Sequence, residues 1–293
     1  MTNDDLDPHA ILHVLGLTDA TSVTPVHGGS DTAIWQVERG GSIYALRVFG
    51  EGRHDDCERE KLVMQATFAG GLPVSQVYAE GIWHEHPALL LSWLPGWPLA
   101  DELRVRPWRA WKLGILFGHM QASIHALPAP GGLDEHPDTW IMWLGPDRPS
   151  LQKCLQVNPH RSDALLHLDY HPFNVLTNGK SITGVLDWRN ACAGEPRADA
   201  ARTGSILCID YVGKPHLRDR VVRKVFELGW RRGYEQKGAT LSNLSLYYLW
   251  AGAVMERDLA SKRTPEELAR IHHWTMKWKR DETCPEMDGD MFH

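Results

Sequence analysis

Short runs in which apolar and polar residues alternate characterise the first third of the chain. A period of two places every second side chain on one face, as in a β-strand that covers a core on one side. Between these runs, a stretch from about Asp55 to Phe68 carries apolar residues at helical spacing. The strands expected from the alternation cover residues 21–26, 33–38, 42–49, 73–79 and 88–93. We therefore expect a small antiparallel sheet interrupted by one helix.

The pattern changes after LPGWP, residues 94–98, whose prolines and glycine indicate a hinge or turn. Beyond this point helical periodicity dominates, and two short strand-like segments, 175–177 and 182–187, flank the turn sequence NGK. Helices are expected over residues 109–127, 217–237, 241–262 and 265–279. The expected fold class is α+β, with a small β-rich N-terminal lobe over residues 1–94 and a larger, mainly helical C-terminal lobe over residues 95–293.

Charge and composition argue against several classes of function. The formal net charge is -6 and the 31 Lys and Arg residues are scattered, which argues against a protein that binds nucleic acid. Five widely spaced cysteines without a C-x-x-C pair indicate reduced thiols. The N-terminal residues lack a signal-peptide pattern, and no apolar run is long enough to cross a bilayer. We expect a soluble, cytoplasmic protein without membrane contact; no pattern reports its oligomeric state.

The string HLDYHPFNVL concentrates polar side chains between apolar residues. On a strand, His167, Asp169 and His171 would point to one face, as the ligands of a transition metal would. A second spacing in the same string is H-x-D-x-x-x-x-N, followed by Asp187 after an apolar run, and this is the arrangement of kinase catalytic machinery. Phosphoryl transfer needs a carboxylate to orient the attacking hydroxyl and hard oxygen ligands for Mg²⁺. We expect Asp169 in the first role, and Asn174 and Asp187 in the second.

Features of the N-terminal third agree with a nucleotide site. Gly28 and Gly29, followed by Ser30, lie between two expected strands, where a loop can approach phosphates and donate backbone N–H groups. Arg47 lies in the strand YALRVF, and Glu60 on the following helix could hold it in position. Taken alone, the glycines are better explained as a hairpin turn, and Arg47 and Glu60 as ordinary exposed charges. Their order relative to the Asp–Asn–Asp set favours phosphate binding.

These segments together resemble the aminoglycoside phosphotransferase and choline kinase-like family, whose fold is similar to that of protein kinases. The resemblance runs from VHGGSD through YALRVF, EREKLVMQA, LLSWLPGWPL and IHALPAP to HLDYHPFNVL, ITGVLDWRNA and GEPRADAA. The last three segments are the most specific. The resemblance implies a two-lobed protein-kinase-like fold, in which Asp169 is the catalytic base and Asn174 and Asp187 are magnesium ligands.

The resemblance also implies ATP as the nucleoside triphosphate and Mg²⁺ as its companion ion. Arg47 would hold the α- and β-phosphates with Glu60 as its partner, and the segment Ser92, Trp93 and Leu94 would be the adenine-binding hinge. Asp199 matches an acidic position that helps to hold the catalytic loop in the family.

The chain differs from the common pattern in three places. Leu168 stands where family members commonly have glycine, and Arg47 replaces the lysine of protein kinases, a variant that many members of the family share. The loop GGSDTA lacks a complete G-x-G-x-x-G.

The expected function is an ATP-dependent small-molecule kinase that transfers the γ-phosphoryl group of Mg-ATP to a hydroxyl. The sequence leaves the class of acceptor open. It allows a cationic acceptor such as an aminoglycoside or a choline- or ethanolamine-like alcohol, and also a sugar or an amino-acid alcohol. Carboxylates and tryptophans that could receive a cation are Asp134, Glu135, Asp138, Trp140, Trp143, Trp250, Glu256 and Asp258; the alternative for each is a packed core or a solvated acid. Two other functions are a transition-metal hydrolase and a catalytically silent kinase-like protein that binds a nucleotide or partner.

Overall fold

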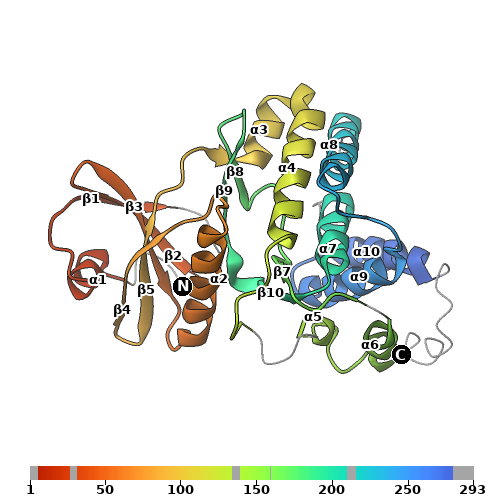
Figure 1. The fold of residues 1–293 in the computed structure, drawn as a ribbon, viewed down its shortest axis with the longest axis horizontal. Helices are drawn as coiled ribbons and strands as arrows, with labels where there is room; N and C mark the ends of the chain where they lie inside the picture. Colours follow the sequence, from red (N-terminus) through yellow and green to blue (C-terminus); the bar gives the residue numbers. More distant parts are fainter. Residues whose placement is uncertain (1–5, 27–31, 134–138, 159, 210–215, 280–293) are drawn as a thin grey trace. The chain divides into compact units, whose positions relative to one another are not determined.

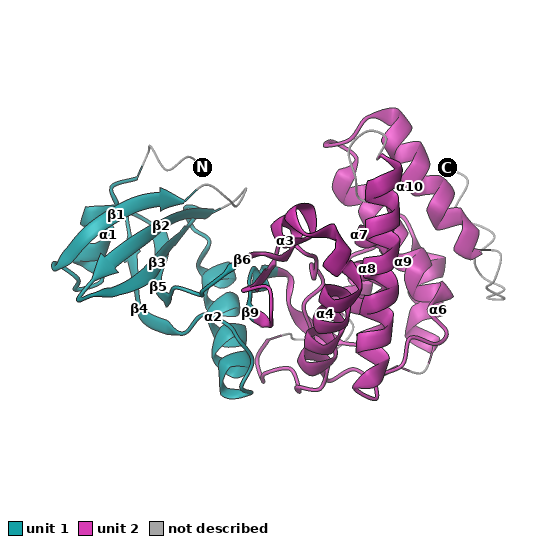
Figure 2. Ribbon diagram, turned by 90° about the horizontal axis from the view of Figure 1, so that it is seen from above, with its two compact units in different colours: residues 1–96, 183–189 teal, residues 97–182, 190–293 magenta. Residues whose placement is uncertain are grey.

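The chain forms two compact units in a computed structural model that describes residues 6–26, 32–133, 139–158, 160–209 and 216–279. Unit 1 comprises residues 1–96 and 183–189, and unit 2 comprises residues 97–182 and 190–293 (Figure 2). The expected division lay after residue 94 and gave residues 183–189 to the helical lobe. They join unit 1 because the amide of Val185 donates a hydrogen bond of 2.8 Å to the carbonyl of Pro73.

Unit 1 is built on a five-stranded antiparallel sheet of order β1-β2-β3-β5-β4 (Figure 1). Its strands are β1 (Ala20–Val26), β2 (Thr32–Arg39), β3 (Ser42–Phe49), β4 (Val77–Trp83) and β5 (His86–Ser92). The predicted strand at 73–79 is misplaced, because the amides of Val74 and Val185 use the carbonyls of Leu72 and Pro73, so the strand begins only at Val77. The other four predicted strands are confirmed to within two residues at each end.

Alternation explains the core of unit 1. Along β2, Ala33, Trp35 and Val37 are buried, because every second side chain points to the same face. They form one cluster with Ile11 and Leu12 of helix α1 (Pro8–Val14), which the pattern did not predict. The predicted helix is present as α2 (His54–Ala69).

Unit 2 is mainly helical. Its α-helices are α3 (Leu99–Val105), α4 (Ala110–His125), α5 (Thr139–Met142), α6 (Pro149–Val157), α7 (Pro196–Ile209), α8 (Leu217–Gln236), α9 (Ser245–Leu259) and α10 (Pro265–Lys279). All four predicted helices are present, although α9 is shorter at both ends than its expected range of 241–262. A short helix of the 3-10 type, Pro107–Arg109, precedes α4.

Helices α4 and α8 lie side by side at a spacing that only glycine allows (Figure 1). A Cβ atom on Gly118 would clash with the carbonyl oxygen of Trp230, and one on Gly233 would clash with that of Ile115. This close approach brings His125 of α4 and Tyr234 of α8 into hydrogen-bond contact at 2.7 Å.

A second core surrounds α9 in unit 2. Trp140 and Trp250 are fully buried there, with ring centroids 5.2 Å apart in an edge-to-face arrangement. Leu166 of β7 (Ala164–Leu166) and Cys192 of β10 (Cys192–Gly194) join this cluster, and the two strands pair antiparallel. The cluster therefore supports the strand that leads into HLDYHPFNVL.

The predicted hairpin around NGK is confirmed. Strand β8 (Val175–Thr177) pairs with β6 (Trp97–Pro98), and β9 (Ile182–Val185) follows after the turn. The Asn178 side chain accepts hydrogen bonds from the amides of Lys180 and Ser181, and Gly179 adopts a φ of 81°. Strand β9 ends two residues before Asp187.

Among the helices of the described ranges, none has the length and apolar character needed to span a membrane. Cys57, Cys192 and Cys208 are reduced thiols, as expected, but Cys154 is disulfide-bonded, which corrects the expectation of reduced thiols at that position. The wide spacing of the cysteines along the chain concealed this, because sequence separation does not report spatial proximity.

Candidate active site

The segment between β7 and β8 is an irregular loop, not a strand. Leu168 adopts a φ of 57°, and this left-handed residue ends the extended chain directly after His167. His167, Asp169 and His171 therefore do not share a strand face, and that geometric expectation is wrong. Within the described ranges, no three His, Cys, Asp or Glu side chains come together as a metal-binding group.

The buried carboxylate of Asp199, on α7, holds the start of this loop. Its Oδ1 accepts a hydrogen bond of 2.8 Å from the amide of Leu168, and its Oδ2 accepts one of 3.1 Å from the amide of His167. His125 Nε2 lies 2.7 Å from the same Oδ2, and His125 Nδ1 contacts the hydroxyl of Tyr234. Burial opposes the ionised form, but the bonds from His125 and His167 outweigh it and lower the pKa of Asp199. The Asp199 carboxylate thus serves as the anchor of the loop.

A second set of buried bonds lies under the same loop. Thr203 of α7 donates to the carbonyl of Tyr170 at 3.1 Å, and Gln121 donates to Thr203 at 2.8 Å. The Tyr170 hydroxyl donates to the carbonyl of Phe117 at 2.9 Å, and the two rings stack. These residues come from α4 and α7, so two helices fix the backbone on the core side of Asp169. Sequence reasoning missed Phe117, Gln121 and Thr203, since none of the three belongs to a short motif.

Leu168 is strained in its backbone and fully buried in its side chain. The left-handed conformation costs an L-residue roughly 1–2 kcal/mol, which accounts for a preference for glycine at this place. Burial of the Leu168 side chain in the α9 core cluster offsets that cost, because losing a buried leucine side chain costs about 2–5 kcal/mol. At Leu168 the stabilisation from side-chain packing therefore offsets the cost of the left-handed backbone.

This balance predicts an unusual order of stability. Both Leu168→Ala and Leu168→Gly lose the buried side chain, but only glycine relieves the strain, so Leu168→Gly should be more stable than Leu168→Ala by about 1 kcal/mol. Urea unfolding of both variants measures this difference. Leu165 of β7, equally buried but without a positive φ, is the matched control, and there glycine should be the worse substitution. An alanine variant at 168 as stable as the glycine variant would contradict the argument.

Asp169 and Asn174 meet within the loop. The Asn174 amide nitrogen donates to the Asp169 carbonyl at 3.0 Å and to its carboxylate Oδ2 at 3.2 Å. The Nε2 atom of His171 lies 3.5 Å from the same Oδ2. Burial raises the pKa of Asp169, but His171, His167 and Arg202 outweigh it and lower the pKa to about 2. Asp169 is accordingly an ionised acceptor at neutral pH.

Arg47, Glu60 and Asp187 form a charged cluster in unit 1. Arg47 Nη1 on β3 lies 2.5 Å from Glu60 Oε1 on α2, and Arg47 Nη2 lies 3.6 Å from Asp187 Oδ1. Glu60 is fully buried, and burial raises its pKa, with a smaller increase from Asp187, although Arg47 lowers it. Asp187 itself adopts a φ of 59°, an uncommon conformation of the kind that accumulates at functional sites. The expected Arg47–Glu60 ion pair is therefore present, and Asp187 is a second acidic neighbour of Arg47.

The other predicted nucleotide residues are only partly described. Ser92 ends β5, opposite Tyr44, and its hydroxyl accepts a hydrogen bond of 2.9 Å from the amide of Gln76. Trp93 and Leu94 lie beyond the last pair of this ladder and are half-buried. Gly28, Gly29 and Ser30 lie outside the described residues.

The predicted site residues thus fall into two groups, one within each unit. Arg47, Glu60 and Asp187 belong to unit 1, whereas Asp169 and Asn174 belong to unit 2. The two expected magnesium ligands, Asn174 and Asp187, are members of different units.

The acids and tryptophans expected to receive a cation have other roles where they are described. Trp140 and Trp250 are fully buried core residues. Glu256 pairs with Arg148 at 3.4 Å, and Asp258 pairs with Arg202 at 3.1 Å. Trp143 packs against the α9 core, and Asp134, Glu135 and Asp138 lie outside the described residues.

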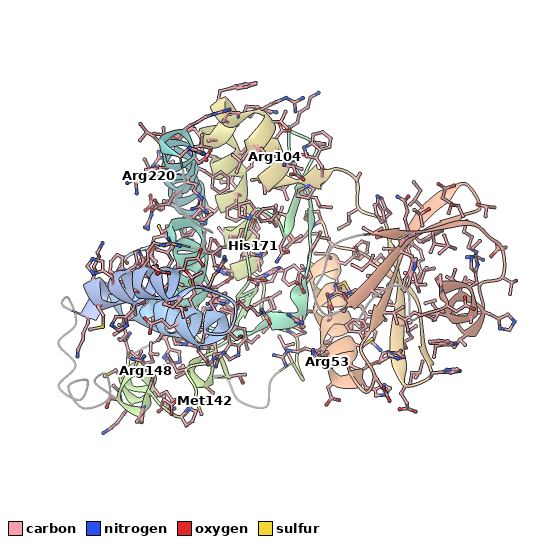
Figure 3. All side chains as sticks on the ribbon, turned by 180° about the vertical axis from the view of Figure 1, so that it is seen from behind. Arg53, Arg104, Met142, Arg148, His171 and Arg220 are labelled. Carbon is pink, nitrogen blue, oxygen red and sulfur yellow. The ribbon has the colours of Figure 1, made fainter. Side chains whose placement is uncertain are left out.

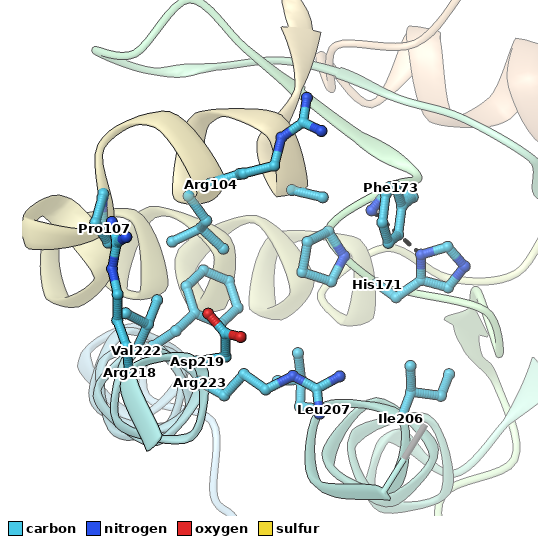
Figure 4. A pocket seen from close by; sticks show the side chains of 14 residues that line it. Arg104, Pro107, His171, Phe173, Ile206, Leu207, Arg218, Asp219, Val222 and Arg223 are labelled. Atoms are coloured by element: carbon cyan, nitrogen blue, oxygen red, sulfur yellow. Dashed lines mark hydrogen bonds between the residues drawn. The ribbon is translucent and has the colours of Figure 1, made fainter. Parts of the chain in front are cut away.

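Unit 2 carries a pocket of about 550 Å³ beside the loop of residues 167–174 (Figure 4). His171, Pro172 and Phe173 of the loop line one side. Helices α3, α7 and α8 and the 3-10 helix Pro107–Arg109 supply the rest, in which the apolar residues are Ala100, Leu103, Pro107, Ile206, Leu207, Val222 and Phe226 and the charged ones are Arg104, Arg218, Asp219 and Arg223.

Comparison with known proteins gives one family and many similar folds. The model of the phosphotransferase enzyme family (APH) matches residues 22–164 and 143–235, which is more than half of the chain. No curated protein sequence matches. Among solved structures, aminoglycoside phosphotransferase APH(4)-Ia is similar at a TM-score of 0.67 and 15% identity, covering 94% of this chain and 97% of that one.

Two further solved structures extend the likeness to kinases of small alcohols. Choline kinase from Cryptosporidium parvum Iowa II has a TM-score of 0.59 and 12% identity, with 89% of each chain covered. Ethanolamine kinase from Plasmodium vivax has a TM-score of 0.54 and 13% identity, and the match covers 92% of this chain and 84% of that one. At these identities the likeness establishes the protein-kinase-like fold alone.

The fold and the family match together define the class of this protein as a phosphotransferase with an alcohol group as acceptor. The chain belongs to the phosphotransferase enzyme family (APH). The two-lobed α+β fold expected from the sequence is thereby confirmed.

Proposed function

We propose that the chain is a small-molecule kinase that transfers the γ-phosphoryl group of Mg-ATP to a hydroxyl. The observation that carries this proposal is the ionised, loop-held Asp169 with Asn174 bonded to it, in a member of a phosphotransferase family. One similar protein, a thermostable mutant of APH(4)-Ia, has been solved with AMP-PNP and hygromycin B, which supports a nucleoside triphosphate as the donor.

In the proposed step, the acceptor hydroxyl oxygen forms a bond to the γ-phosphorus as the bond from this phosphorus to the bridging oxygen of ADP breaks. Asp169 orients the hydroxyl and accepts its proton, which is then lost to water. Asp199 keeps the amides of His167 and Leu168 in place, so the position of Asp169 is set before the substrate arrives.

Asn174 and Asp187 are the proposed magnesium ligands. Their carboxylate and amide oxygens are the hard donors that Mg²⁺ prefers. The amide nitrogen of Asn174 is used by Asp169, which leaves its Oδ1 atom for a metal. Bound Mg²⁺ would neutralise charge on the phosphates.

Arg47 is the proposed phosphate ligand, with Gly28, Gly29 and Ser30 as a covering loop and Ser92, Trp93 and Leu94 as the adenine hinge. The buried Nε atom of Arg47 has no hydrogen-bond partner within the described part of the chain, although Glu60 holds Nη1. A buried donor without a partner is costly, which supports a ligand oxygen as its partner.

Replacing Arg47 tests the nucleotide half of this proposal. Arg47→Met should raise the KM for Mg-ATP about tenfold or more, because a hydrogen bond to a charged group contributes about 1.5–3 kcal/mol and each 1.4 kcal/mol is tenfold. ADP release at varied Mg-ATP measures KM, with a thermal melt to verify folding. Arg39→Met, at a largely exposed surface pair with Asp19, should leave KM unchanged. An unchanged KM in folded Arg47→Met would remove Arg47 from the nucleotide site.

A further inference from the structure

The pocket beside the loop of residues 167–174 lies next to Asp169 through His171. His171 is both a lining residue and a neighbour of the catalytic carboxylate, since its Nε2 lies 3.5 Å from Asp169 Oδ2. Pro172 is fixed to the opposite wall, because its carbonyl accepts a hydrogen bond of 3.0 Å from the amide of Ala100 at the start of α3. A molecule in this pocket therefore lies one side chain away from Asp169. A volume of about 550 Å³ is suited to a small molecule.

The charge of this pocket is positive. Arg104, Arg218 and Arg223 line it, and among the lining residues that the structure describes Asp219 is the one acid. Arg104 shares its charge with Asp101 at 3.0 Å, outside the lining, and arginine stays protonated at any physiological pH. Figure 4 shows Arg223 extending from α8 toward Leu207 of α7.

The floor of the pocket is apolar. Leu103, Val222 and Phe226 come from α3 and α8, and Phe173 presents a largely exposed ring from the catalytic loop. Apolar lining with a few charged groups is the usual composition of a ligand pocket, in which the charges select and orient the ligand. This lining favours an acceptor with an apolar body and an acidic group.

Positive charge continues along α7 toward the catalytic carboxylate. Arg202 lies one helical turn before the lining residue Ile206 and is 8% exposed. Its Nη2 pairs with Asp258, while its Nε and Nη1 have no hydrogen-bond partner within the described ranges. Glu256 and Asp258, which the sequence offered as partners for a cationic acceptor, are each already paired with an arginine.

From this we infer that the natural acceptor is a small anionic alcohol, bound through a carboxylate or phosphate by Arg218 and Arg223 with its apolar part against Phe173 and Phe226. The inference rests on the proposed kinase function and names its class of acceptor. It departs from the cationic acceptors that the sequence left open. Guanidinium groups suit carboxylate and phosphate because they donate paired, charge-assisted hydrogen bonds.

Three benzyl alcohols of matched size test the inference. They carry at the para position a carboxylate, a methyl group or an aminomethyl group, and a fourth probe, 4-(hydroxymethyl)phenyl phosphate, distinguishes phosphate from carboxylate recognition. Binding to the full chain is measured by ligand-observed NMR in the presence of saturating Mg-AMP-PNP, which occupies the nucleotide site. ADP release from Mg-ATP is measured in parallel.

The double variant Arg218→Gln/Arg223→Gln links any preference to the pocket. We expect wild-type protein to bind at least one of the two anionic alcohols at least tenfold more tightly than the neutral one, and the cationic one least. The double variant should lose this preference. Its affinity for the neutral alcohol should differ from that of wild type by less than threefold. Arg220→Gln, on the same helix but exposed and outside the pocket lining, is the matched control and should behave as wild type (Figure 3).

Two results overturn the inference. One is tighter binding of the neutral or cationic alcohol than of both anionic probes, and the other is an anion preference that survives in the double variant. Binding decides the matter even if none of the probes is phosphorylated. Failure of the kinase function is distinguishable, because it shows as an absence of ADP release with every alcohol, whereas failure of this inference shows in the order of the binding affinities.

Discussion

Asp169→Asn should reduce phosphoryl transfer by about a thousandfold while leaving nucleotide affinity within threefold of wild type. A positioned group that takes part in proton transfer contributes roughly 10²–10⁴-fold, and asparagine keeps the size of the side chain but cannot accept the hydroxyl proton. Asparagine also retains an oxygen that can accept the hydrogen bond from Asn174, so the loop should keep its shape.

Steady-state ADP release with an accepted alcohol measures the rate, and a thermal shift with Mg-AMP-PNP reports nucleotide binding. Asp163→Asn, at an exposed aspartate just before β7, is the control and should leave both unchanged. A rate within tenfold of wild type in Asp169→Asn would show that another group orients the hydroxyl.

The largest loss of stability should follow from Asp199→Asn. The two carboxylate oxygens take bonds from the amides of His167 and Leu168 and contact His125, whereas an asparagine has one acceptor oxygen and leaves a buried donor without a partner. Breaking such a buried pair costs about 3–5 kcal/mol. The free energy of unfolding in urea measures this cost, and again Asp163→Asn should change it by less than about 0.5 kcal/mol. A cost below about 1 kcal/mol for Asp199→Asn would refute the anchoring role.

The lowered pKa of Asp199 also predicts how the free energy of unfolding depends on pH. Its folded pKa is lowered below the ordinary value of 3.8, so the unfolded chain binds the proton more readily. The stabilisation is therefore fully present above pH 3.8 and is lost as the pH falls through the lower folded pKa. Unfolding curves from pH 6 downward should show a smaller acid-induced loss in Asp199→Asn than in wild type. Equal acid-induced losses in the two proteins would contradict this assignment.

The sequence predicted elements whose burial follows a simple period. Strand β3 has the expected bounds, 42–49, because alternate residues face the core, and α10 has the expected bounds, 265–279. The spacing of Asp169 and Asn174 was also informative, since a separation of five positions in a loop brings the two side chains into contact. These features depend on local geometry, which a single stretch of sequence carries.

Features that depend on distant packing were not predictable in the same way. Helix α7 was missed because it is buried on nearly all sides, so Ala198, Asp199, Ala201 and Ser205 show no polar stripe. His125 and Tyr234 meet although 109 positions separate them, and their contact depends on glycines that let α4 and α8 approach. The leucine at position 168 gives no indication of a left-handed conformation by itself, and the one signal for it was that members of the resembling family commonly have glycine there.

The most direct test of the central claim is a ³¹P NMR spectrum of the full chain incubated with Mg-ATP and an alcohol acceptor. We predict that the γ-phosphate resonance is lost with equal gain of ADP and of a phosphate monoester of the acceptor, and that Asp169→Asn protein shows neither within the same time. ADP together with inorganic phosphate alone, or monoester formed at the wild-type rate by Asp169→Asn, would contradict the proposal that this loop transfers phosphate to a hydroxyl.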